Sequence, residues 1–334
     1  MQTFERPRVV VSRCIDFDHC RWNGDMIRSE VVQRMKEHVE FVPVCAEAEI
    51  GLGIPREPVR LVEEHDEIRL VQHETDRDVT EMMTDFAASF LDGLGEVDGF
   101  LLKSRSPSCG TRGVKIYRSM KGGTSQGTTA GLFAQAVLTR HPDLPVEDEG
   151  RLRNRRIREH FLVRLFTLAA FRAARAHGDI HSLADFHARN KLLLMAYSQK
   201  ELQTLGRVAA NQEKRSVEEV TATYEAHLRT ALERPPRAAS RINVLFHALG
   251  YFKDRLSPEE KAFFLETVEQ YRRDEVALCP NLTILRSWIV RFGIDYLADQ
   301  TFFSPLPPGL MAVPPDLSQD QRDYWKDERG RQRP

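Results

Sequence analysis

The stretch at residues 8–14 reads RVVVSRC, a short β-branched run followed by a polar turn that carries Cys14. The same order of features returns in FVPVC, which ends at Cys45, and in GFLLKSRSPSCG, which carries Cys109. Helical patterns lie between these runs, at residues 27–38 and in the segment that begins at Thr80. Strands alternating with helices of this length predict a parallel sheet covered on both faces.

The remaining pattern predicts a second, different domain. Apolar runs at residues 68–72, 114–117 and 144–146 predict further strands, and residues 129–139 a helix. Beyond Gly150 we expect only helices, at residues 158–176, 182–210, 217–232, 242–250 and 258–273. The predicted fold class is therefore α/β, with a Rossmann-like parallel-sheet domain over residues 1–150 and an all-α domain over 151–305. An extended proline-rich tail is expected over residues 306–334.

The composition excludes several classes of protein. The chain has 41% hydrophobic and 29% charged residues, which is typical of a soluble globular protein. No run of apolar residues is long enough to span a membrane, and the first residues do not resemble a signal peptide, so we expect a cytoplasmic protein. Five cysteines are too few for a disulfide framework in a reducing compartment. Cys279 is expected to be a small buried hydrophobe.

The position of three cysteines after three strands suggests a metal centre. Loops at the carboxyl ends of parallel strands meet at one crevice, and Cys14, Cys45 and Cys109 each lie in such a loop. Their dispersed spacing excludes a zinc ribbon, which requires CxxC pairs. Three thiolates from three loops suit an iron–sulfur cluster with one iron left open, although buried or incidental thiols would produce the same spacing.

The residues around these cysteines resemble the thiouracil desulfidase family. The segments SRCIDFDHCRWNGD, PVCAEAEIGLGIPREP and SPSCG occur in the family's order, within residues 6–149. Two positions depart from the family pattern: residues 15–17 read IDF instead of leucine–leucine–glycine, and Ala46 replaces proline. Neither change removes a cysteine, so they concern the shape of the substrate pocket.

The resemblance implies a [4Fe–4S] cluster ligated by Cys14, Cys45 and Cys109. Cys20 matches a position where the family admits valine, and is more simply a small residue near the site. The implied reaction is a non-redox hydrolysis, in which an open iron polarises the carbon–sulfur bond and water replaces sulfur. Glu47 matches the family's glutamate and is the candidate proton carrier, with a loop ion pair to Arg56 as its alternative role.

Two serines of the same motif are further candidates for the site. Ser106 and Ser108 in RSPSCG could bind the substrate or position water. Hydroxyls that stabilise a turn are equally common in such a segment, so the sequence does not choose between these roles.

Charge is unevenly distributed along the predicted helical domain. Residues 151–215 hold 14 Lys or Arg and 5 Asp or Glu, although the whole chain has a net charge of −1. The run RLRNRRIR at residues 151–158 contains the candidate RNA-binding residues Arg151, Arg153, Arg155 and Arg156. Such a bias is typical either of a phosphate-contacting surface or of a solvated helix face.

The helical segment also resembles a domain that is often fused to thiouracil desulfidases. The resemblance is carried by the segments DFHARNKLLLMAYSQKELQTLGRVAAN and RINVLFHALGYFKDRLSPEEKAFF. The fused arrangement is similar to the tRNA 4-thiouridine desulfidases, and it implies tRNA containing 4-thiouridine as the partner. Two alternatives stay open: a desulfidase of free thiouracil, and a non-enzymatic iron–sulfur redox sensor. The arginine bias favours tRNA over a free base, and Glu47 favours an enzyme over a sensor.

Overall fold

The computed structural model describes residues 3–118 and 124–311 and divides the chain into two compact units. Of the described residues, the sheet unit comprises 8–118, 124–140, 146–161 and 307–311. The helical unit comprises residues 1–7, 141–145 and 162–306. The expected proline-rich tail lies outside the described residues from position 312 onward.

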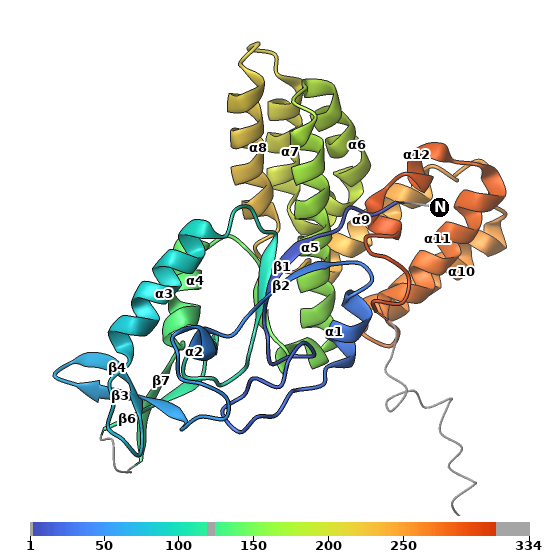
Figure 1. Cartoon of the computed structure of the whole chain (residues 1–334). Helices are drawn as coiled ribbons and strands as arrows, with labels where there is room; N and C mark the ends of the chain where they lie inside the picture. Colours follow the sequence, from blue (N-terminus) through green and yellow to red (C-terminus); the bar gives the residue numbers. More distant parts are fainter. Residues whose placement is uncertain (1–2, 119–123, 312–334) are drawn as a thin grey trace, which may run out of the picture. The chain divides into compact units, whose positions relative to one another are not determined.

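A four-stranded parallel sheet forms the centre of the sheet unit, as predicted for an α/β fold. Its spatial order is β2 (Glu40–Val44), β1 (Arg8–Ser12), β5 (Gly99–Leu102) and β8 (Val146–Asp148). Four helices belong to this unit: α1 (Glu30–Met35), α2 (Ala46–Glu49), α3 (Thr80–Gly93) and α4 (Leu132–Arg140). Figure 1 shows α3 and α4 on one side of the sheet and α1 on the other.

The central strands are apolar because both faces of the sheet are covered. Val9, Val10 and Val11 of β1 are fully buried, as are the Phe100 and Leu101 side chains of β5. β-branched and aromatic residues pack well on a pleated surface, so these short runs form strands. All three neighbouring pairs are parallel, and the carboxyl ends of the strands therefore lie along one edge of the sheet.

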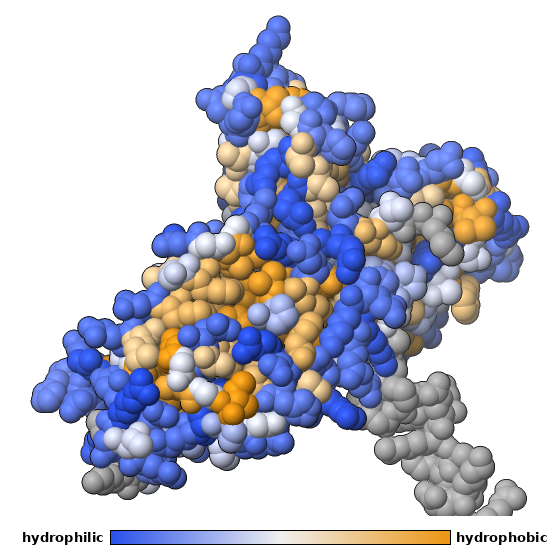
Figure 2. Space-filling model, viewed as in Figure 1, coloured by the Kyte–Doolittle hydropathy of each residue, from blue (hydrophilic) through white to orange (hydrophobic). Residues whose placement is uncertain are grey.

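A second four-stranded sheet was not predicted. Its order is β4 (Glu67–Gln72), β3 (Val59–Glu64), β6 (Val114–Tyr117) and β7 (Ser125–Thr129). Residues 68–72 and 114–117 are strands, as expected, but they pair here rather than in the parallel sheet. Apolar side chains of this sheet are buried. The tip of the β3–β4 hairpin is hydrophilic (far left in Figure 2).

Helices make up the described part of the chain from residue 149 onward, as predicted. They are η1 (Arg151–Arg153), α5 (Arg155–Ala176), α6 (Ile180–Tyr197), α7 (Gln199–Ala210), α8 (Val217–Ala231), α9 (Ala238–Gly250), α10 (Pro258–Arg272), α11 (Leu278–Phe292), α12 (Asp295–Ala298) and η2 (Thr301–Phe303). The core of the helical unit includes Phe171 stacked on Tyr224, with ring centroids 5.7 Å apart. No described helix has both the length and the apolar character required to cross a membrane.

The helices differ from the sequence prediction in their number as well as in several of their bounds. Residues 182–210 are two helices, because Ser198 ends α6 and its hydroxyl accepts a hydrogen bond from the backbone NH of Glu201 in α7. Helix α11 was not predicted. Cys279 lies in its first turn and is exposed, so the expectation of a buried thiol was wrong.

Candidate metal centre and active site

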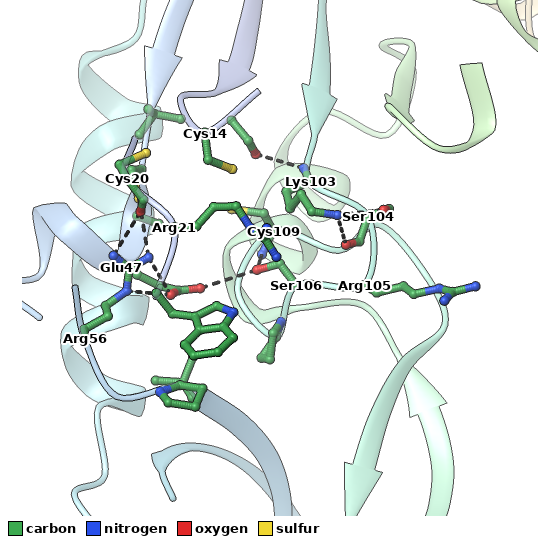
Figure 3. A pocket seen from close by; sticks show the side chains of 18 residues that line it. Cys14, Cys20, Arg21, Glu47, Arg56, Lys103, Ser104, Arg105, Ser106 and Cys109 are labelled. Carbon is green, nitrogen blue, oxygen red and sulfur yellow. Dashed lines mark hydrogen bonds and ion pairs between the residues drawn. The ribbon is translucent and has the colours of Figure 1, made fainter. Parts of the chain in front are cut away.

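Three cysteine loops meet at the carboxyl edge of the parallel sheet. Cys14 follows β1, Cys45 follows β2 and begins α2, and Cys109 lies in the loop after β5. All three line one cavity of about 300 Å³, which we call the cysteine pocket (Figure 3). The sequence therefore placed the three loops correctly relative to one another.

Cys20 also belongs to this group. It lines the cysteine pocket, is fully buried, and its thiol hydrogen bonds with the thiols of Cys14 and Cys45. The Cys45 Sγ is 3.6 Å from the Cys20 backbone carbonyl oxygen, to which it donates. Cys20 is therefore in direct contact with two of the candidate ligands.

The environment of the Cys20, Cys45 and Cys109 thiols raises their pKa values and so disfavours their ionisation. The hydrogen bond with Cys14 raises the pKa of Cys20, and the hydrogen bond with Cys20, together with burial, raises the pKa of Cys45. Burial raises the pKa of Cys109 to about 12. Several thiols that oppose one another's ionisation are a suitable donor set for a positively charged metal group, which removes their protons on binding.

The donor set consists of thiols, the ligands that hold iron–sulfur clusters. Within residues 3–118 and 124–311, no three His, Cys, Asp or Glu side chains converge closely enough to hold one metal ion. Cluster ligands lie farther apart, because each cysteine binds a different iron atom. The Arg56 Nη2 lies 3.8 Å from the Cys45 Sγ and supplies a positive charge beside the thiols.

Glu47 lies in the wall of the cysteine pocket and is held by three side chains. The Arg56 guanidinium donates to its carboxylate at 2.8 Å, which is the ion pair that the sequence left open as an alternative. The Ser108 Oγ donates to Glu47 Oε1 at 2.9 Å, and the Ser106 Oγ lies 3.4 Å from the same oxygen. Both partners of the ion pair are largely buried, so the carboxylate has a fixed position next to the Cys45 loop.

The structure gives the two serines of the motif different roles. Ser108 is fully buried, and its hydroxyl is directed at Glu47. Ser106 lines the cysteine pocket, and its hydroxyl oxygen accepts hydrogen bonds from the backbone NH groups of Ser108 and Cys109, at 3.2 and 3.1 Å. Both hydroxyls therefore contact the carboxylate, and Ser106 in addition shapes the turn and lines the pocket.

The loop that carries Cys109 is held by the beginning of α4. The backbone NH groups of Leu132 and Ala134 donate to the carbonyls of Pro107 and Ser108, at 3.1 and 3.0 Å. The first backbone NH groups of a helix have no acceptor within the helix. These hydrogen bonds give two of them an acceptor and at the same time fix the position of the Cys109 loop. A Cβ atom on Gly131 would lie 2.6 Å from the backbone of Pro107 and Ser108.

We predict that Gly131→Ala displaces this loop and destabilises the protein by about 1–3 kcal/mol, because the contacting atoms belong to the backbone and cannot rotate away. Thermal unfolding and iron content after reconstitution would measure both effects. Gly93→Ala is the matched control, since a Cβ there meets no atom within 4 Å. Equal stability of the two variants would contradict the assigned role of Gly131.

Lys103 and Glu149 form a second buried ion pair at the strand ends. The Lys103 Nζ donates to Glu149 at 2.6 Å, and the Ser104 backbone NH and hydroxyl donate to the same carboxylate at 2.8 and 2.7 Å. Burial alone would raise the pKa of Glu149, but the hydrogen bonds from Lys103 and Ser104 outweigh it and lower the pKa. The ionised pair therefore links Lys103, directly after β5, to Glu149, directly after β8.

Sequence reasoning missed two residues of the pocket wall. Trp22 lines the cysteine pocket with 46% of its surface exposed, and its backbone carbonyl accepts a hydrogen bond from the Arg56 NH at 2.8 Å. Lys103 also lines the pocket. Trp22 could have been found from the sequence, because a large aromatic residue two positions after Cys20 lies in a polar turn, where no hydrophobic core is expected.

The four arginines of the candidate RNA-binding segment are not equivalent. Arg151 is ion-paired with Glu147, with its Nε 2.7 Å from the carboxylate. Arg153, Arg155 and Arg156 are exposed, and no carboxylate in the described part of the chain pairs with them. Arg155 and Arg156 stand in the first turn of α5, where the helix dipole disfavours positive charge. The charges of Arg155 and Arg156 therefore do not stabilise the helix.

Comparison with known proteins identifies two regions of similarity. The family model described as 2-thiouracil desulfurase matches residues 9–149, and a model described as a protein of unknown function, DUF1722, matches residues 191–307. The uncharacterised protein YbbK of Bacillus subtilis (strain 168) is 32% identical over 138 residues, which cover 38% of this chain and 90% of YbbK. The uncharacterised protein YbgA of Escherichia coli (strain K12) is 27% identical over 148 residues, covering 44% of this chain and 88% of YbgA.

One solved structure is also similar. It is described as the [4Fe-4S]-dependent thiouracil desulfidase TudS, with 27% identity, and the match covers 44% of this chain and 94% of that chain. The TM-score is 0.35, so this superposition carries no argument about the site. The assignment to a family rests on the sequence matches.

Proposed function

Because the chain belongs to the 2-thiouracil desulfurase family through residues 9–149, joined to a DUF1722 domain, we propose that it is a [4Fe–4S]-dependent tRNA 4-thiouridine desulfidase. The family implies a desulfidase and a substrate of the thiouracil type. The observation that carries the proposal is the meeting of Cys14, Cys45 and Cys109 in one pocket whose wall holds Glu47.

Cys14, Cys45 and Cys109 would hold the cluster, since each lies in a loop that follows a different strand of the parallel sheet and all three line the pocket. When bound, the cluster supplies a thiophilic Lewis acid that draws electron density from the carbon–sulfur bond. Arg56 would offset part of the negative charge of the thiolates, because its guanidinium contacts both Cys45 and Glu47.

Glu47 would act as the proton carrier of the hydrolysis. It accepts one proton from water as the oxygen attacks C4, and returns it to the departing sulfur. The second proton leaves the new hydroxyl as the carbonyl forms, so the thiocarbonyl and water give uridine and hydrosulfide without electron transfer. Ser108 and Arg56 keep the carboxylate in place, and Ser106 offers the pocket a hydroxyl.

Trp22 would bind the face of the thiolated base. Its ring is large, half exposed and part of the pocket wall. Flipped or single-stranded bases commonly stack on such aromatic side chains. Its backbone hydrogen bond to Arg56 keeps this surface at a fixed place relative to Glu47.

We expect the arginines of the α5 segment to distinguish tRNA from a free base. Replacing Arg153, Arg155 and Arg156 together by glutamine should weaken tRNA binding and reduce its log–log salt dependence by about 0.7–0.9 for each lost phosphate contact. Desulfuration of free thiouracil should stay within about twofold, because a neutral base offers no phosphate. The measurements are binding of tRNA at several salt concentrations and turnover of both substrates.

Arg151→Gln is the matched control for this test. It removes one positive charge from the same segment, but Arg151 already pairs with Glu147 and is expected to contribute less to the salt dependence. An unchanged salt slope in the triple variant would exclude the segment from the RNA contact. The second candidate function, desulfuration of free thiouracil, would then be favoured by the family description alone.

A further inference from the structure

A second cavity adjoins the cysteine pocket. It has a volume of about 550 Å³, and we call it the basic groove. The two cavities share Pro58, Val59, Arg105 and Pro107 in their walls. The two cavities therefore lie side by side, separated by no more than these shared side chains.

The groove is positively charged. Arg60 of β3, Arg105 and Lys115 of β6 line it, and the described part of the chain contributes no carboxylate to its walls. Arg105 and Lys115 are exposed. Figure 3 shows the Arg105 side chain extending away from the cysteines, so its charge lies outside the space that a cluster and a base would occupy.

The groove also has an aromatic and a hydroxyl component. The Arg60 guanidinium lies over the Tyr117 ring, 4.9 Å from its centroid, which holds the cation in place at the wall. Ser125 and Thr128 of β7 add hydroxyl groups. Cations combined with aromatic rings and hydroxyls are typical of surfaces that follow a nucleic-acid backbone.

We infer that the basic groove binds the sugar–phosphate backbone of a polynucleotide beside the nucleotide whose base enters the cysteine pocket. This inference rests on the proposed function of that pocket. A free base would leave the groove without a ligand, whereas a nucleotide in a chain has phosphates on both sides. Phosphate contacts there would offset the cost of taking the base out of its stack.

The test replaces Arg105 and Lys115 together by glutamine, and uses unmodified tRNA transcript as the probe, so that no turnover occurs. Binding is measured at several salt concentrations. The double variant should bind more weakly, with a log–log slope reduced by about 1.4–1.8 for two lost contacts, and Lys115→Gln alone should give about half of that change. Arg112→Gln is the control, because Arg112 is an exposed cation three residues before Lys115 and lines neither cavity.

The outcomes separate this inference from the function of the pocket. Unchanged affinity and slope in the double variant, or an equal loss in the Arg112 control, would overturn the groove as an RNA contact. Failure of the wild-type holoenzyme to desulfurate any thiolated uracil would overturn the proposed function, while the transcript-binding result would still stand. A normal desulfidase whose double variant binds transcript normally would refute the groove alone.

Discussion

Replacing Cys14, Cys45 or Cys109 by alanine is expected to abolish the brown chromophore of anaerobically reconstituted protein, together with desulfidase activity. Each thiol comes from a different loop of the parallel sheet, and no other described thiol except Cys20 lines the pocket. The wild-type protein should contain close to four irons and four sulfides per chain. Iron and sulfide analysis and the visible absorption spectrum measure this result.

Cys279→Ala is the matched control, since Cys279 is exposed on α11 in the helical unit and should leave the cluster unchanged. Cys20→Ala tests the number of ligands, and we expect it to keep the chromophore. Loss of iron in Cys20→Ala would show that four protein thiols hold the cluster. Full iron content in all three primary variants would overturn the cluster assignment.

Glu47→Gln is expected to keep the cluster and to lower turnover by about 10²–10⁴-fold, the usual contribution of an acid–base group. Glutamine has the shape of glutamate and its single oxygen can still accept the hydrogen bond of Ser108 or that of Arg56, which reach different oxygens of Glu47, but it cannot carry the proton. The measurement is single-turnover desulfuration by enzyme of known iron content.

Glu49→Gln provides the matched control, because Glu49 lies in the same short helix, pairs with Arg13 and does not line the pocket. Its activity should stay within about twofold of wild type. Glu47→Gln also leaves the buried Arg56 without a countercharge, so thermal unfolding should be recorded alongside activity. A loss smaller than about tenfold in a stable, iron-loaded variant would exclude Glu47 as the essential proton carrier.

Local pattern was sufficient to predict the parallel sheet and the convergence of its cysteine loops. The apolar runs before Cys14 and Cys45 are short, β-branched and separated by helical segments, and sheet topology then fixes where the loops lie. The start of α10 at Pro258 was also predicted, since its Ser257 cap depends only on neighbouring residues. The second sheet was missed because β3 mixes apolar and charged residues and pairs with β6, more than 50 residues away.

The differences between neighbouring residues of the same type could be seen only in the three-dimensional structure. The sequence could not choose between Ser106 and Ser108, because both hydroxyls reach the same oxygen of Glu47, and only the fold shows that Ser106 lines the pocket while Ser108 is fully buried. It could not show that Arg151 pairs with Glu147 while Arg153 stays exposed, since both belong to one arginine run.

The dependence of the Cys109 loop on α4 also sets the order in which the site can be completed during synthesis. Cys14 and Cys45 leave the ribosome early, but the backbone donors that fix the third loop belong to Leu132 and Ala134. A nascent chain shorter than this presents at most two correctly placed loops to iron. A cluster held by all three cysteines would therefore be inserted after synthesis of α4, into a nearly finished sheet unit rather than an emerging chain.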